Sequence, residues 1–196
     1  MDIVIATWNK GKLKEIKELL KDLHIKLFSL NDFSNLPEVK EDGLTFQENA
    51  LKKAKVIAEI TGFSVLADDS GLEIKALGGK PGIYSARFSG KGANDAKNVK
   101  KVLKLMKYVP EEKRQAHFIT SACLFISNEN IFFTEGICEG DIIFEPLGDN
   151  GFGYDPIFVP KGYIKTFAEL SETVKNRISH RARAMKKIRK IIIQRL

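Results

Sequence analysis

The distribution of apolar residues changes in the middle of the chain, and this change restricts the fold class more than any other feature. Over residues 2–108, short apolar runs alternate with segments whose apolar residues recur every three or four positions, as in strands alternating with helices. Residues 116–144 are instead rich in β-branched and aromatic residues, with turn residues at 128–130 and at 136, which indicates an antiparallel meander. We therefore expect a mixed α/β fold in a single domain over residues 1–196.

Turn and capping residues set the expected element boundaries. Thr45, with Glu48 three residues later, forms a capping box that starts a helix, and Gly62 ends that helix. Ser179 is a suitable N-cap for the last helix. The expected strands cover residues 2–6, 63–67, 72–76, 116–127, 131–135, 137–144 and 156–159, and the expected helices cover 13–23, 45–61, 94–108, 166–170 and the C-terminal amphipathic segment 178–192.

The positive charge lies at one end of the chain. The formal net charge is +7, which at first suggests a nucleic-acid-binding protein. Nine of the 32 Lys and Arg residues lie within 175–196, which has no acidic residue, so 23 remain for the rest of the chain against 25 Asp and Glu. The body of the protein is therefore slightly acidic, and nucleic-acid binding through the basic C-terminal helix is only an alternative interpretation.

The cysteine content and the apolar runs argue against a disulfide-scaffold, a secreted or a membrane-spanning protein. Cys123 and Cys138 lie in apolar, strand-like runs, so we interpret both as core residues and expect no disulfide scaffold. The N-terminus lacks the layout of a signal peptide, and no apolar stretch approaches the roughly 20 residues of a membrane span. We expect a cytoplasmic protein that does not contact a membrane.

The segment Thr7-Trp8-Asn9-Lys10-Gly11-Lys12 joins the first strand to the first helix. Such a segment directs backbone N–H groups and the positive end of the helix dipole at one point, and its lysines add charge. It therefore favours a phosphate site, although the P-loop spacing is absent. The alternative is an ordinary helix start with solvated lysines.

A pair of adjacent acids, Asp68 and Asp69, follows an apolar run. Two neighbouring carboxylates repel one another and are unfavourable to desolvate, so a bound hard cation or an acid–base role explains them better than a capped turn does. Mg²⁺ typically takes one or two carboxylates together with phosphate oxygens and water. Glu41 is a further candidate ligand, but Glu38 and Asp42 compete with it, and spacing alone does not choose between the three.

Two further segments complete the candidate site. In residues 148–156, glycines flank Phe152 and Tyr154, so the backbone can approach a planar ligand and an aromatic ring can stack on it; a tight turn with a buried ring is the alternative. In residues 175–181, His180 and Arg181 form a candidate recognition pair for an anionic ligand. A nucleoside triphosphate satisfies all four segments, whereas no Ser-His-Asp order or Cys-rich metal spacing offers a competing chemistry.

These residues resemble the inosine/xanthosine triphosphate pyrophosphatases, which remove non-standard purine nucleotides from the nucleotide pool. The resemblance covers nearly the whole chain. It rests on six motifs in order: Thr7-x-Asn9-x-x-Lys12-x-x-Glu15, Gly43-Leu44-Thr45-Phe46-x-Glu48-Asn49-Ala50, Ala67-Asp68-Asp69-Ser70-Gly71-Leu72, Gly78-Gly79-x-Pro81-Gly82-x-Tyr84-Ser85-Ala86-Arg87, Gly151-Phe152-Gly153-Tyr154-Asp155-Pro156 and Lys175-Asn176-x-x-Ser179-His180-Arg181.

The resemblance implies an elongated, two-lobed α/β fold whose central mixed sheet is flanked by helices, with the active site in the cleft between the lobes. It also implies a homodimer and a Mg²⁺-dependent cleavage between the α and β phosphates of ITP, dITP or XTP. The residue roles that it implies are phosphate binding by Thr7, Trp8, Asn9, Lys10, Gly11 and Lys12; metal binding by Glu41 and Asp69; general-base catalysis by Asp69 with support from Asp68; and substrate contacts by Ser70, Phe152, Gly153, Tyr154, Asp155, Lys175, His180 and Arg181.

Base selectivity has a simple physical basis in this scheme. Arginine only donates hydrogen bonds, so Arg181 favours the 6-keto acceptor of inosine and xanthosine over the 6-amino donor of adenosine. Guanosine is also a 6-keto purine, so a contact near the 2-position must exclude its amino group. A pyrophosphatase that prefers other modified bases, such as modified pyrimidines, remains the alternative enzyme.

Overall fold

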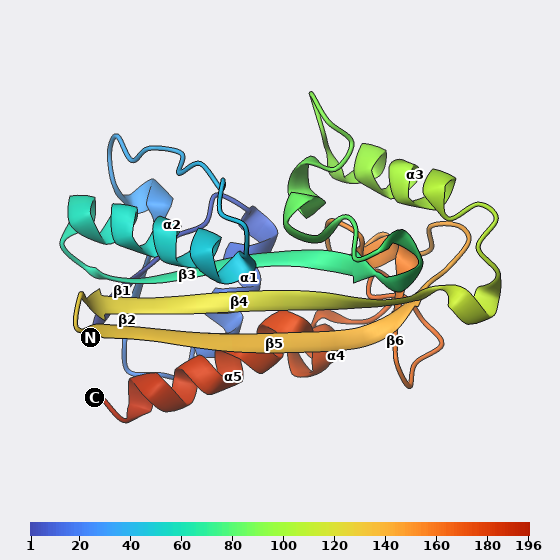
Figure 1. The fold of residues 1–196 in the computed structure, drawn as a ribbon. Helices are drawn as coiled ribbons and strands as arrows, with labels where there is room; N and C mark the ends of the chain where they lie inside the picture. Colours follow the sequence, from blue (N-terminus) through green and yellow to red (C-terminus); the bar gives the residue numbers. More distant parts are fainter. The chain divides into compact units, whose positions relative to one another are not determined.

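The computed structural model describes residues 1–196 and shows a mixed α/β fold (Figure 1). Its six-stranded sheet has the order β2-β1-β3-β4-β5-β6, with β1 parallel to both β2 and β3 and with β5 antiparallel to β6. The strands are β1 Asp2–Ile5, β2 Lys26–Ser29, β3 Ser64–Ile74, β4 Gln115–Ser127, β5 Asn130–Ile142 and β6 Phe158–Pro160, and the helices are α1 Lys10–Leu20, α2 Phe46–Thr61, α3 Asp95–Leu105, α4 Glu172–Ile178 and α5 His180–Ile193. The predicted mixed sheet flanked by helices is confirmed.

The chain divides into two compact units. The first unit comprises Met1–Asp69, Thr120–Gly136 and Arg181–Leu196, and the second comprises Ser70–Ile119 and Ile137–His180. No helix is long and apolar enough to cross a membrane. Cys123 and Cys138 are buried free thiols, as predicted.

In the first unit, helices cover both faces of the sheet because neighbouring strand residues point in opposite directions. Ile3 and Ile5 of β1 face a cluster formed with α1 and α5, whereas Val4 faces a cluster formed with α2. On β3, Leu66 likewise faces the cluster with α1 and α5, and Val65 faces the cluster with α2. Figure 1 accordingly shows α2 and α5 on opposite sides of these strands.

The second unit has one apolar core. Leu72 and Ile74 of β3 pack with Val99 and Val102 of α3 and with Met106, the C-cap of that helix. A group of aromatic rings completes this core: Phe118 lies edge-on to Phe158, with ring centroids 4.8 Å apart, and Phe158 contacts Phe167 at 5.3 Å.

Capping chemistry predicted α2 well. Thr45 is its N-cap, with the hydroxyl accepting from the Glu48 N–H at 3.1 Å, and the Glu48 carboxylate accepts from the Leu44 N–H at 2.7 Å. Gly62 ends the helix at φ 70°, a backbone conformation that suits glycine.

The loss of this N-cap has a predictable effect on stability. We expect Thr45→Ala to lower the free energy of unfolding by about 1 kcal/mol, because the Glu48 N–H loses its side-chain acceptor. Thr45→Ser keeps the hydroxyl and is expected to stay near the parent value. Urea unfolding of the three proteins measures the difference, and equal midpoints for Thr45→Ala and the parent would contradict the assigned cap.

Two predicted breaks in strands are wrong. The strands predicted at 63–67 and 72–76 are parts of one strand, β3, which runs from Ser64 to Ile74 and passes through the acidic pair instead of turning there; residues 75–76 lie in a short 3-10 helix after it. Its register with β1 ends at Leu66, and the long strand β4 lies on its other side, so the edge shared with β4 supports the continuation. Likewise, β5 continues through the buried Gly136, where a turn was expected.

The C-terminal third also differs from the prediction. Residues 166–170 form a turn and not a helix: the Thr166 N–H donates to the Glu169 carboxylate, and the Glu169 N–H donates to the Thr166 hydroxyl. The helix α4 was missed, although Ser171 caps it by accepting from the Val174 N–H at 3.3 Å. The helix α5 begins directly after Ser179, as predicted. The short strand β2 was not predicted either.

Candidate active site

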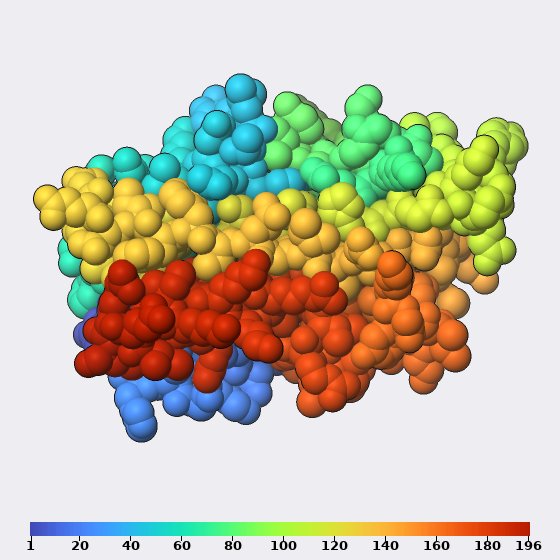
Figure 2. Space-filling model, turned by 60° about the horizontal axis from the view of Figure 1, so that its bottom comes forward, coloured from blue at the N-terminus to red at the C-terminus, as the bar shows by residue number.

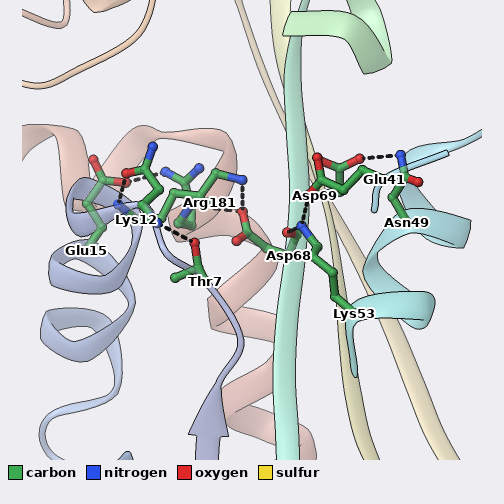
Figure 3. Close-up of polar contacts among 10 residues, drawn as sticks. Thr7, Lys12, Glu15, Glu41, Asn49, Lys53, Asp68, Asp69 and Arg181 are labelled. Carbon is green, nitrogen blue, oxygen red and sulfur yellow. Dashed lines mark hydrogen bonds and ion pairs between the residues drawn. The ribbon is translucent and has the colours of Figure 1, made fainter. Parts of the chain in front are cut away.

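The acidic pair is buried within β3, and the strand separates its two carboxylates. Asp68 is 1% exposed and Asp69 is 6% exposed. Because successive strand residues point to opposite faces, Asp68 faces the side of α1 and α5, whereas Asp69 faces the side of α2. Figure 3 shows the two side chains pointing apart, Asp68 toward Lys12 and Arg181 and Asp69 toward Asn49. The two carboxylates therefore lie on different faces of the sheet.

Asp68 belongs to a buried ion network. Its Oδ2 lies 3.1 Å from Lys12 Nζ and 3.3 Å from Arg181 Nε, and Arg181 Nη1 donates to the Glu15 carboxylate. Burial acts to lower the pKa of Arg181, but Asp68 and Glu15 outweigh it and the pKa is raised. Burial lowers the pKa of Lys12, and Asp68 offsets only part of this effect. Asp68 thus pairs with two positively charged side chains, one in the first turn of α1 and one in the first turn of α5.

Asp69 lies in a second polar group, on the side of α2. Asn49 Nδ2 donates to Asp69 Oδ2 at 2.9 Å, and Lys53, one turn further along α2, donates to Glu41 Oε1 and to the Asp68 carbonyl, each at 2.5 Å. Burial raises the pKa of the Asp69 carboxyl, against the opposing effects of Lys53 and Lys12. Burial acts to lower the pKa of Lys53, but the charges of Glu41, Asp69 and Asp68 raise it overall.

The surroundings of Asp69 suit a hard cation. Glu41 and Asp69 offer carboxylate oxygens as ligands. The positively charged ammonium group of Lys53 pairs with Glu41, which shows that this position accommodates positive charge. Among the competing acids, Glu38 is exposed, and Asp42 is exposed and pairs with Lys52, so the geometry favours Glu41. No group of three or more His, Cys, Asp or Glu side chains is arranged to hold a metal ion. Two carboxylates match the way Mg²⁺ binds, with substrate phosphates and water as its other ligands.

The predicted phosphate loop has an ordered backbone. Asn9 is the N-cap of α1 and accepts from the Lys12 N–H at 3.0 Å, while the Thr7 hydroxyl accepts from the Asn9 N–H at 3.2 Å. Trp8, Asn9 and Lys10 are exposed, and Gly11 and Lys12 are partly buried. The N-terminus of this eleven-residue helix is therefore accessible to an anion.

The glycine-rich loop of the second unit is also held by side chains. The Asp155 carboxylate is buried, accepts from the Phe152 N–H at 2.8 Å and pairs with the buried Lys175. Lys175 Nζ also lies 4.6 Å from the centroid of the Phe152 ring. Gly151 has φ 78°, and a Cβ built there would lie 2.1 Å from Asp155 Oδ2, so both conformation and space require glycine.

Of the two candidate stacking rings, only Phe152 is accessible. Tyr154 is 4% exposed, and its hydroxyl donates to the Ser85 carbonyl at 2.8 Å. Burial raises the pKa of this hydroxyl. The ring of His180 is also buried and stacks on Phe118 at 4.7 Å. Tyr154 and His180 therefore belong largely to the core of the second unit.

The predicted site residues fall into both units. Thr7 to Lys12, Glu41, Asp68, Asp69 and Arg181 belong to the first, and Ser70, Phe152 to Asp155, Lys175 and His180 belong to the second. Sequence reasoning assigned no role to Asn49, Lys53 or Glu15. Asn49 and Lys53 lie four residues apart on the face of α2 that carries Ala50 and Ala54, and polar residues on such a face are a signal that could have identified them.

Comparison with known proteins agrees with the fold and the motifs. The Ham1 family model matches residues 3–191. A dITP/XTP pyrophosphatase of Desulforamulus reducens is 49% identical over 98% of this chain and 96% of its own length, and one of Shouchella clausii is 49% identical over 97% and 96%. The solved structure of a HAM1 protein from Coxiella burnetii superposes with a TM-score of 0.90 at 42% identity and covers 99% of each chain.

Proposed function

Because the chain belongs to the Ham1 family, we propose that it hydrolyses dITP, ITP and XTP to the nucleoside monophosphate and pyrophosphate. This activity removes deaminated purines from the nucleotide pool. The observation that carries the proposal is that the two acids of β3 point to opposite faces of the sheet. Asp68 pairs with the side chains of Lys12 and Arg181, and Asp69 faces Glu41, Asn49 and Lys53.

The first unit supplies the groups that act on the phosphates. In the proposal, the N-terminus of α1, from Thr7 to Lys12, binds the triphosphate through backbone N–H groups, the helix dipole and lysine charge. Lys12 is held in place by Asp68, which is the support that Asp68 gives to catalysis. Lys53 supplies a further positive charge close to Asp69.

Asp69 is proposed as the general base that takes a proton from the attacking water. A carboxylate is a stronger base when its pKa is raised, and burial raises the pKa of Asp69. The amide of Asn49 fixes the orientation of the carboxylate. Glu41 and Asp69 would hold Mg²⁺, which, when bound, neutralises phosphate charge.

The second unit supplies most of the proposed base-binding groups. Phe152 offers an accessible ring, and Gly153 gives its backbone a close approach to a planar ligand. Asp155 and Lys175 hold the conformation of this loop. Ser70 and His180 of this unit, and Arg181 of the first unit, stay in the proposal as substrate contacts, and the donor-only guanidinium of Arg181 favours a 6-keto purine.

The proposal also includes a homodimer and a cytoplasmic location, where the nucleotide pool is used. The single catalytic domain with its active site in a cleft stays a prediction. Light scattering of the purified protein tests the dimer: a mass twice that of the 22.0 kDa chain is expected, and a monomer would contradict it.

Product analysis tests the reaction itself. Incubation of the purified protein with dITP and Mg²⁺, followed by ³¹P NMR, is expected to show dIMP and pyrophosphate in equal amounts. Chelation of divalent cations is expected to stop the reaction, and added Mg²⁺ to restore it. Formation of dIDP and orthophosphate, or full activity in the presence of a chelator, would contradict the proposed reaction.

A further inference from the structure

The glycine-rich loop is tied to the first turn of α3 by a hydrogen bond that none of the motifs explains. Asp95, the first residue of α3, accepts from the Gly153 N–H through its Oδ2 at 2.7 Å, across 58 residues of sequence. Asn94 caps the helix and leaves the Asp95 carboxylate in its first turn, where the helix dipole stabilises a negative charge. Asp95 is therefore an acceptor fixed by its helix and directed at the loop.

A second tie connects the same helix turn to the same loop through Ser85. The Ser85 carbonyl accepts from the Tyr154 hydroxyl at 2.8 Å and from Asn98 Nδ2 at 3.3 Å. Asn98 Nδ2 also donates to the Ala86 carbonyl at 3.0 Å, and its Oδ1 accepts from the Ser89 N–H at 2.8 Å. Asn98 is buried and lies one turn after Asp95. The loop thus contacts α3 directly through Gly153 and indirectly through Tyr154.

The loop needs these hydrogen bonds because its glycines allow its backbone many conformations. Gly151 and Gly153 both have positive φ values, 78° and 64°, and glycine loses more conformational freedom than any other residue when it is fixed. Asp155 orders one end of the loop by accepting from the Phe152 N–H. Asp95 accepts from the Gly153 N–H.

We propose that Asp95 is a positioning residue, which fixes Gly153 and with it the accessible ring of Phe152 for contact with the purine base. The inference rests on the proposed function in one respect, namely that the loop binds the base. Asp95 acts through the backbone of the loop and does not touch the substrate. Its side chain is exposed, so its replacement removes no core packing.

Two substitutions separate the hydrogen bond from the charge. Asp95→Ala removes the acceptor, and Asp95→Asn keeps an acceptor oxygen while it removes the charge. We expect Asp95→Ala to raise the KM for dITP about tenfold with little change in kcat, the equivalent of one lost hydrogen bond to a charged group. Asp95→Asn is expected to stay near the parent KM. Glu111→Ala removes an exposed acid from the start of a short 3-10 helix of the same unit, Glu111–Lys113, and serves as the control.

Amide hydrogen exchange of the full-length protein gives a readout that does not depend on activity. We expect the Gly153 amide to exchange about tenfold faster in Asp95→Ala, and at the parent rate in Asp95→Asn and Glu111→Ala. Unchanged exchange and unchanged KM in Asp95→Ala would overturn the proposal, and so would equal impairment by Asp95→Asn. If the parent protein fails to hydrolyse dITP, the proposed function fails, and faster Gly153 exchange in Asp95→Ala alone then still supports the positioning of the loop.

Discussion

Asp69→Asn is expected to lower kcat/KM for dITP by about 10³-fold, within the usual contribution of general acid–base catalysis. The substitution preserves the shape of the side chain but removes the oxygen that accepts a proton. The donor Asn49 Nδ2 keeps a carbonyl oxygen as its partner. Pyrophosphate release with saturating Mg²⁺ measures the loss, and Asp141→Asn, an exposed acid on β5, is the matched control.

The same substitution is expected to leave the fold intact or more stable. Burial raises the pKa of Asp69 in the folded protein above its value in the unfolded chain, so ionisation of this carboxyl costs stability as the pH rises through that range, and the full cost is present at pH 7. The neutral amide removes this penalty at pH 7. Retained activity would show that Asp69 is not the base. A lower urea midpoint for Asp69→Asn than for the parent would contradict the electrostatic argument.

Arg181→Met is expected to cause the largest loss of stability, about 3–5 kcal/mol in the free energy of unfolding. The Arg181 side chain is 2% exposed and lies between Asp68 and Glu15. Methionine fills a similar volume but removes the guanidinium from beside two carboxylates that are largely shielded from water, so less positive charge lies near them. Urea unfolding at pH 7 measures the loss.

Two further variants test this explanation. Lys186→Met removes a positive charge from an exposed position of α5 and is expected to change stability by less than about 0.5 kcal/mol. The double substitution Arg181→Met with Glu15→Gln also removes one of the two carboxylates that pair with Arg181, and it is expected to recover part of the loss. A loss below about 1 kcal/mol for Arg181→Met alone, or no recovery in the double variant, would contradict the account of the buried network.

The fold was most predictable where local chemistry fixes an element. Thr45 and Gly62 mark both ends of α2, because an N-cap hydroxyl and a left-handed glycine satisfy helix ends without help from distant residues. The acidic pair misled the prediction because its repulsion is relieved by Lys12, Arg181 and Lys53, which come from three separate helices. With these partners the strand continues, and nothing local to residues 68–71 shows them.

The site was predictable in its residue types but not in its geometry. The adjacent acids indicated metal binding or acid–base chemistry, but not which carboxylate faces which helix. Strand alternation assigns Asp68 and Asp69 to opposite faces, a result that follows only once β3 is known to be continuous. Tyr154 looked equivalent to Phe152 as a stacking ring, but its hydroxyl has a partner 69 residues away, the Ser85 carbonyl. Long-range hydrogen bonds of this kind leave no periodic signal in a sequence.

The basic C-terminal segment also changes meaning in the structure. Lys175, Arg181 and Arg189 pair with Asp155, with Asp68 and Glu15, and with Asp22, so three of its nine cations neutralise acids of other segments. On α5, which Figure 2 shows at the surface in red, the exposed lysines are Lys186, Lys187 and Lys190. The segment therefore serves internal ion pairs as well as the solvated surface.

The most direct test of the central claim is a competition between bases in one reaction. Equimolar dITP, dGTP, dATP and a modified pyrimidine triphosphate are incubated with the protein and Mg²⁺, and the nucleotides are separated at intervals. A site built on hydrogen bonds to the base is expected to discriminate strongly, by up to about 10⁴-fold against dATP. We expect dITP to be converted to dIMP and pyrophosphate while the other three persist; equal consumption of all four, or preferential loss of the pyrimidine, would contradict the proposed base selectivity.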